Sequence, residues 1–129
     1  AGTDDPCGPA ERKTPAELIA DIRAEAGEAA FLLLLTHRND QLPQWSALGV
    51  QAVLAGHCHG GVVRLPFVGG LFGTDRRLFP AWDAGLYRQG ETVLYVSRGL
   101  GYTNVHFRLF NRPEVAVIVL RRGDPAINS

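Results

Sequence analysis

Two short apolar runs, each followed closely by a histidine, constrain the fold of this chain more than any other feature. Residues 31–35 lead within two positions to His37, and residues 50–55 lead in the same way to His57. Continuous apolar runs of strand length are typical of buried strands, and we expect 31–35 to be a central strand covered on both faces. The segment between the runs, 42–48, has weak helical character, so the order predicts a parallel strand-helix-strand crossover and an α/β fold. Ligands bind outside the carboxyl ends of strands in such sheets, which is where both histidines fall.

A helix over 15–26 is the clearest single element of the sequence. Thr14 is the expected N-cap, Pro15 the first helical residue and Glu17 the partner in a capping box. Apolar residues then recur at helical spacing, and Gly27 is a natural stop.

The rest of the chain is predicted to form short strands, a long loop and two irregular ends. Further apolar runs predict strands at 62–65, 92–97, 106–109 and 115–120. Residues 66–90 are rich in apolar side chains but lack a clear strand or helix period, so we expect a long loop there. Residues 1–13 are expected to be a loop or linker and 122–129 a tail. The structured part, 14–121, then forms a single partial domain.

Size and charge argue against several classes of protein. The chain has 129 residues, which fits one domain, and its formal net charge of zero argues against a general binder of nucleic acid. Its longest apolar run, 29–35, is shorter than the roughly 20 residues of a membrane span. Two cysteines do not make a disulfide framework. Because the sequence contains no methionine, we expect it to be a fragment of a longer protein.

Three histidines are candidate metal ligands: His37, His57 and His59. Neutral imidazole is the commonest protein ligand for metals such as Zn, Fe and Mn. If the backbone of His57-Cys58-His59 stays extended, the two rings point the same way and reach one metal or two neighbouring metals, while Cys58 points away. His106 lies inside a predicted strand and is expected to be structural. The surrounding glycines let phosphate or metal approach the main chain, and they are candidates for a substrate loop: Gly56, Gly60 and Gly61.

Several segments together carry a resemblance to a known family. They lie at 35–37, 56–61, 63–67, 85–87, 95–101 and 112–115. In these segments the chain resembles the calcineurin-like metallophosphoesterases, and in particular a bacterial branch with exported or membrane-associated members. Residues 2–5 resemble the linker between the two halves of that branch. The resemblance implies that the chain is the C-terminal half of a four-layer α-β-β-α sandwich with a mixed sheet. It also implies a dinuclear metal centre in which His37 and His57 bind one ion and His59 the other.

The same resemblance implies a function for the parent protein. It would hydrolyse phosphate monoesters, phosphodiesters or pyrophosphates with two divalent ions, which would be Mn, Fe or Zn. In the family, a bridging Asp, an Asp-x-His pair, an Asn and a catalytic His complete the site from the amino-terminal half. The chain has no Asp-x-His and no Gly-Asn-His motif, so no catalytic residue is assigned to it. Because three neutral imidazoles cannot offset two dications, we expect the isolated chain to be inactive and to bind at most one ion, weakly.

Two other functions stay open from the sequence. One is a mononuclear zinc hydrolase that uses the three histidines and a water. The other is a non-enzymatic scaffold that binds a partner through its sheet. The expected partners are the missing N-terminal half, a second copy of the fragment, and a phosphate-ester substrate, for which the apolar 66–90 segment points to a lipid-linked molecule. The compartment is undetermined; the resemblance alone points to the membrane or to export, and the chain itself contains no recognisable targeting segment.

Overall fold

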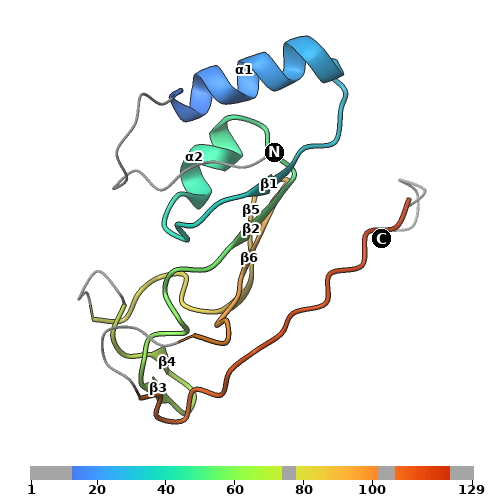
Figure 1. The fold of residues 1–129 in the computed structure, drawn as a ribbon. Coiled ribbons are helices and arrows are strands. Elements are labelled where there is room, and N and C mark those ends of the chain that lie inside the picture. Colours follow the sequence, from blue (N-terminus) through green and yellow to red (C-terminus); the bar gives the residue numbers. More distant parts are fainter. Residues whose placement is uncertain (1–12, 74–77, 102–106, 123–129) are drawn as a thin grey trace.

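The structure, a computed structural model, describes residues 13–73, 78–101 and 107–122 (Figure 1). The elements of this part of the chain follow in the order α1 (Pro15–Ala26), β1 (Leu33–Leu35), α2 (Leu42–Ala47), β2 (Ala52–Ala55), β3 (Arg64–Leu65), β4 (Gly69–Gly70), β5 (Gly85–Gln89) and β6 (Thr92–Val96). Most of the expected N-terminal loop, His106 and most of the expected tail lie outside the described residues. Among the described helices, none has the length and apolar character that crossing a membrane requires.

The main sheet is mixed, with the strand order β1-β2-β6-β5. β1 and β6 run parallel to β2 on its two sides, and β5 runs antiparallel to β6. The register pairs Leu34 with Val53, and Val53 with Leu94, so that buried side chains form a row across three strands. The α/β class, the mixed sheet and the parallel crossover from β1 through α2 to β2 are confirmed.

The core lies where both helices meet the sheet. α1 contributes Ile19, and α2 contributes Leu42 and Trp45, to the same buried cluster as the apolar residues of β1, β2 and β6. Burying one such side chain stabilises a fold by about 1.5–3 kcal/mol. Figure 1 shows both helices at the end of the molecule opposite β3 and β4. The core therefore holds one end of the sheet, and the strand ends that carry the histidines point towards the other.

α1 begins where the sequence places its start. The Thr14 backbone N–H donates to Glu17 Oε2 at 2.7 Å, and the Glu17 N–H donates to Thr14 Oγ1 at 3.3 Å. This reciprocal capping box satisfies N–H groups that the helix itself leaves unpaired. At the other end the Gly27 N–H donates to the Arg23 carbonyl at 2.8 Å. The predicted helix is confirmed at both ends.

The prediction that 31–35 forms a central strand covered on both faces is wrong. Only Leu33–Leu35 pairs, and β1 is an edge strand of the described sheet. Leu34 is buried, whereas Leu35 is 54% exposed. An apolar run indicates that its side chains are buried in the assembled protein, but it does not show which neighbouring elements bury them.

The expected loop at 66–90 contains strands that sequence reasoning missed. β5 pairs with β6 along its whole length across the turn at Gly90-Glu91, where Gly90 has φ 56°. Gly in a two-residue connection is a hairpin signal that could have revealed β5. β4 pairs with β3, which is the shorter form of the strand predicted at 62–65.

The strand predicted at 115–120 is not formed in the described part of the chain. Residues 111–122 pair with no strand there, and Figure 1 shows this segment running away from the sheet. Val115 and Val117 are 74% and 83% exposed. Alternation of apolar residues predicts a strand, but a strand also needs a partner for its backbone. Of the strand predicted at 106–109, Leu109 forms an isolated parallel bridge with Val63.

Candidate metal centre

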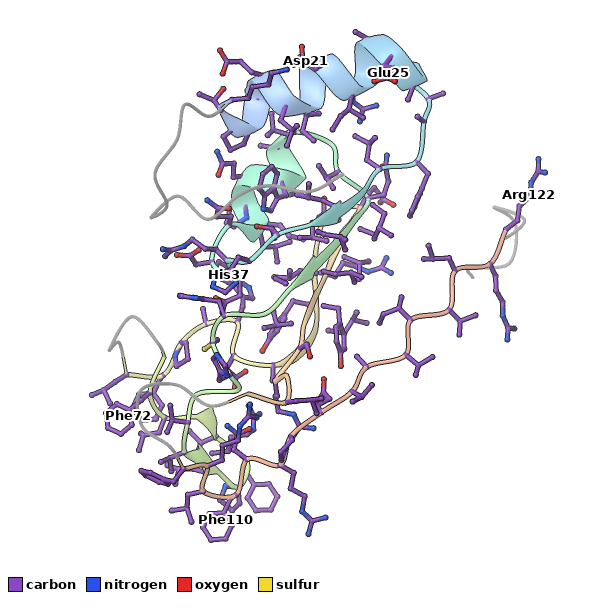
Figure 2. The ribbon with its side chains drawn as sticks, viewed as in Figure 1. Asp21, Glu25, His37, Phe72, Phe110 and Arg122 are labelled. Carbon is purple, nitrogen blue, oxygen red and sulfur yellow. The ribbon has the colours of Figure 1, made fainter. Side chains whose placement is uncertain are left out.

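The parallel strands β1 and β2 bring two of the three predicted histidines together. The Thr36 N–H donates to the Leu54 carbonyl at 3.0 Å, and the Gly56 N–H donates to the His37 carbonyl at 3.3 Å, so the two chains stay side by side beyond the strands. His37 Nε2 then lies 2.8 Å from His57 Nδ1. The two rings meet edge to face, with centroids 4.6 Å apart. Figure 2 shows His37 at this junction, beyond the carboxyl end of β1.

This nitrogen pair brings two candidate metal ligands together, and in the structure the two rings share a hydrogen bond of 2.8 Å between His37 Nε2 and His57 Nδ1. Imidazole nitrogens bind zinc at about 2.0–2.1 Å, so at the tetrahedral angle two such ligands lie about 3.3 Å apart. The observed distance is therefore that of a shared proton, and an ion in place of this proton would move the two nitrogens apart. Two neutral imidazoles are nevertheless a donor set that suits a transition-metal ion, and the remaining ligands have to come from elsewhere.

A carboxylate lies near the pair but is held by its own partner. The Arg38 guanidinium donates to Asp40 through two bonds of 3.0 and 2.6 Å. The bonds from Arg38 and its positive charge hold the pKa of Asp40 below its ordinary value although burial opposes this. Asp40 is therefore an ionised carboxylate near the pair, and Arg38 offsets its charge.

His59 is placed apart from the other two rings. Its Nδ1 lies 3.3 Å from the Gly101 carbonyl oxygen and 3.5 Å from Arg108 Nη2. Among the described residues, no group of three His, Cys, Asp or Glu side chains is close enough to hold one metal ion. In one tautomer the His59 Nδ1–H donates to the Gly101 carbonyl and leaves Nε2 as the metal-binding atom, whereas in the other tautomer Nδ1 accepts from Arg108. His59 is thus arranged for a different position from that of the pair.

The backbone explains why the three rings do not converge. The extended conformation considered for His57-Cys58-His59 is not adopted, since His57 has φ 66° and His59 has φ 51°. The Cys58 N–H donates to the Gly56 carbonyl at 2.8 Å, which turns the chain. Left-handed residues rotate the side chains away from the alternation of a strand. The two histidines therefore face different neighbours.

Residues 56–62, here named the metal loop, carry backbone strain. Besides the two histidines, Val62 has φ 40°, which is unusual for a β-branched residue. Each such residue costs about 1–3 kcal/mol and persists only where its surroundings enforce it. Strain of this kind is concentrated at functional sites, so the contacts that hold the metal loop are of particular interest.

Two of the three predicted glycines are required by the loop geometry. Gly60 and Gly61 have φ 69° and 77°. A Cβ on Gly61 would lie 2.6 Å from the Gly70 Cα, and one on Gly60 would lie 2.6 Å from Asn111 Oδ1. Gly56 has neither a positive φ nor an atom within 4 Å of such a Cβ. A role in phosphate binding stays a prediction for all three.

Asn111 clamps the loop from the C-terminal side and was missed by sequence reasoning. It is 2% exposed, and its Nδ2 donates to the His59 carbonyl at 2.7 Å and to the Val62 carbonyl at 3.4 Å. Its Oδ1 is buried and has no hydrogen-bond partner among the described residues. Asn111 begins an Asn-Arg-Pro sequence between the predicted strands 106–109 and 115–120, a composition typical of a turn, so its role has no local signal.

An ion pair makes a second set of contacts with the loop. Arg64 Nη1 donates to the Gly60 carbonyl at 3.0 Å and to Asp83 Oδ2 at 2.7 Å. Asp83 also accepts from the Gly70 N–H at 2.5 Å and from the Tyr87 hydroxyl at 2.6 Å. Burial raises the pKa of Asp83, but the bonds from Tyr87 and Gly70 and the charge of Arg64 outweigh it, so the pKa lies below its ordinary value. Asp83 is therefore a buried, ionised and fully engaged carboxylate.

Comparison with known proteins finds relatives that are named metallophosphoesterase or phosphodiesterase. The chain is 35% identical over 91 residues to the uncharacterized metallophosphoesterase YkuE of Bacillus subtilis, covering 70% of this chain and 31% of YkuE. It is 37% identical over 90 residues to the phosphodiesterase YaeI of Escherichia coli, covering 68% and 32%. It is 31% identical over 104 residues to the metallophosphoesterase Cj0846 of Campylobacter jejuni, covering 80% and 26%. The chain thus spans about a third of the length of these relatives. No family model and no solved structure matches it.

Proposed function

The chain belongs to the calcineurin-like metallophosphoesterases, and we propose that it contributes ligands to a two-ion centre that hydrolyses phosphate esters. The observation that carries the proposal is that His37 Nε2 and His57 Nδ1 meet, 2.8 Å apart, at the ends of adjacent parallel strands. Two imidazoles brought together in this way supply the kind of ligand that transition metals prefer in proteins.

The three candidate histidines divide between the two ions of this centre. His37 and His57 hold the first ion, and His59 holds the second through Nε2, while the Gly101 carbonyl keeps its Nδ1 protonated. Bound divalent ions polarise a phosphoryl oxygen and lower the pKa of coordinated water, which is the chemistry that ester hydrolysis requires. The metal loop keeps His57 and His59 in fixed and different orientations, so that the two ligands serve different ions.

The remaining ligands come from the rest of the domain. Three neutral imidazoles leave about four positive charges uncompensated, and anionic ligands are needed to offset them. A site of this kind lies between the present chain and the part of the relatives that it does not span. The first consequence is that the isolated chain binds at most one divalent ion, weakly, as isothermal titration with Mn²⁺ or Zn²⁺ would measure. Two tight ions on the isolated chain would contradict the shared site.

Phosphodiesters are the substrate class best supported at present. The name of the Escherichia coli relative, phosphodiesterase, points to this class. Exposed apolar side chains extend the proposal to lipid-linked esters: Phe67 is fully exposed, and Figure 2 shows Phe72 and Phe110 at the end of the molecule that carries β3 and β4. Replacing Phe67 and Phe110 by Ser would then lower turnover of a phosphodiester in lipid vesicles and spare a soluble one. If the variant and the unaltered protein turned over the vesicle substrate equally, the proposal of lipid-linked substrates would be wrong.

The complete gene product is the right material for the main test. Hydrolysis of bis-p-nitrophenyl phosphate is measured with Mn²⁺ for the unaltered protein and for His37→Ala, His57→Ala and His59→Ala. Each variant is expected to lose at least about a hundredfold in kcat/KM, because a metal ligand is lost. Glu25→Gln, at an exposed position of α1, is the matched control and should keep full activity. Full activity in His57→Ala would overturn the proposed function.

Two features of this chain lack a neighbouring strand among the described residues, and we expect other parts of the same protein, or a second copy of the chain, to contact them. Residues 115–120 form an apolar segment that pairs with no strand of the described chain, and β1 has an open edge. Such features pair with other strands readily. We propose that the rest of the domain covers them in the complete protein, and that the isolated chain self-associates. Light scattering of the isolated chain at tens of micromolar tests this, and a monodisperse monomer would argue against it.

A further inference from the structure

Arg64 and Asp83 form an ion pair that holds the metal loop from outside, and we propose that this pair is a positioning device for the His59 metal ligand. The inference rests on the proposed function for the identity of the ligand, but not for the geometry.

The pair connects the loop to a distant part of the chain. One nitrogen of Arg64, Nη1, bridges the Gly60 carbonyl at 3.0 Å and Asp83 Oδ2 at 2.7 Å. Gly60 directly follows His59, and its carbonyl belongs to the Gly60–Gly61 peptide, so the bond from Arg64 holds the chain one peptide unit beyond the His59 ligand. Asp83 comes from the segment before β5, which makes the link a tertiary one that the local sequence does not supply.

The two oxygens of Asp83 have separate tasks. Oδ2 faces the loop side, where it accepts from Arg64 and from the Gly70 N–H. Gly70 in turn packs against Gly61, since a Cβ on Gly61 would meet the Gly70 Cα at 2.6 Å. Through Oδ2 the carboxylate is therefore linked to Gly60 by way of Arg64 and to Gly61 by way of Gly70.

Oδ1 serves only its own turn. It accepts from the Ala84 N–H at 2.8 Å and from the Tyr87 hydroxyl at 2.6 Å. The Tyr87 hydroxyl also accepts from the Asp83 and Ala84 N–H groups, so its removal is expected to loosen the start of β5. The bridge from Arg64 to the Gly60 carbonyl involves Oδ2 and is expected to remain. The chain thus offers a matched pair of changes on one carboxylate, of which only one faces the metal loop.

The hydrogen bond from Arg64 to the Gly60 carbonyl matters because the backbone of the metal loop is strained. His59 and Val62 are held at φ 51° and 40°, conformations that such residues leave when they are free to do so. Without the bond from Arg64, the Gly60 carbonyl loses its link to Asp83, although Asn111 and main-chain bonds at Gly61 and Val62 still hold other parts of the loop. The ring of His59 then samples positions away from the metal, and loss of a group that orients a ligand weakens metal binding by about 10–100-fold.

The test compares Arg64→Gln with Tyr87→Phe in the complete gene product. Mn²⁺ affinity is measured by competition with a fluorescent chelator, and the mobility of the loop by hydrogen exchange at the Gly61 amide, which donates to the Cys58 carbonyl at 2.8 Å. Arg64→Gln is expected to bind at least one Mn²⁺ about tenfold more weakly and to exchange the Gly61 amide faster. Tyr87→Phe should match the unaltered protein within twofold in both measurements. Arg64→Lys keeps a positive charge opposite Asp83 and takes the place of Arg64→Gln if that variant fails to fold. Its loss of Mn²⁺ affinity should lie between those of Arg64→Gln and Tyr87→Phe.

Several outcomes separate this inference from the proposed function. Unchanged affinity and unchanged exchange in Arg64→Gln would overturn the positioning role. Equal losses in Arg64→Gln and Tyr87→Phe that follow their loss of stability would also overturn it, because the pair would then act on the fold in general. If the unaltered protein bound no metal at all, the proposed function would fail, whereas selective loosening of the Gly61 amide in Arg64→Gln would still support the positioning of the loop.

Discussion

Replacing Gly61 by alanine measures how strongly the metal loop depends on a residue without a side chain. Gly61 has φ 77°, and an alanine in this left-handed region costs about 1–2 kcal/mol. The new Cβ would also lie 2.6 Å from the Gly70 Cα, a backbone atom that cannot rotate away. Overpacking of this kind costs about 1–3 kcal/mol. The expected loss in the free energy of unfolding is therefore about 2–5 kcal/mol, a large part of the 5–15 kcal/mol typical of a domain.

Gly56→Ala is the matched control for this measurement. Gly56 lies in the same loop, but it has no positive φ, and its Cβ would meet nothing within 4 Å. Its substitution should change the free energy of unfolding by less than about 0.5 kcal/mol. Urea unfolding of both variants of the complete gene product gives the comparison. If Gly61→Ala unfolded at the same urea concentration as Gly56→Ala, the packing and conformation deduced for the loop would be wrong.

Three further predictions concern the contacts around the loop and the open segment. Asn111→Ala removes the donor to the His59 carbonyl. It should lower the free energy of unfolding by about 1–3 kcal/mol, measured with urea, and weaken Mn²⁺ binding. Unchanged Mn²⁺ binding would count against a role of Asn111 in holding the loop. Because the pKa of Asp83 is depressed in the fold, its stabilisation is complete above its ordinary pKa of 3.8 and is lost as the pH falls through the lower folded value. The difference in stability between the unaltered protein and Asp83→Asn should therefore shrink on acidification below pH 3.8, and a constant difference would refute the assignment. Val117→Lys should leave the stability of the isolated chain within about 0.5 kcal/mol but destabilise the complete gene product, as paired thermal melts would show.

The helix and the histidine pair were predictable because their causes are local or topological. The capping box at Thr14 needs only residues three positions apart. The meeting of His37 and His57 follows from two apolar strands joined by a short helix, since parallel neighbours end at the same edge of a sheet. The strand β5 had a turn signal at Gly90 that could have been used, so its omission was an error of interpretation and not a limit of the sequence.

The position of His59 was not predictable from its spacing. A His-x-His pattern places two rings on one side only while the backbone stays extended, and the chain turns at His57 instead. The conformation that replaces the extended one is imposed by residues more than 40 positions away, since Asn111 holds the His59 carbonyl. Side chains that act at such distances carry no mark in the local pattern.

By itself, the sequence determined the α/β class, the start of α1, the crossover from β1 to β2 and the junction of two histidines at its end. These features depend on hydrophobic period, helix capping and chain topology, which neighbouring residues already specify. Only the tertiary structure decided that His59 faces away from the pair, that Arg64, Asp83 and Asn111 hold the metal loop, and that residues 115–120 find no partner strand among the described residues. The physical reason is that strained backbone and strand pairing are settled by long-range hydrogen bonds, whose partners the chain brings together only by folding.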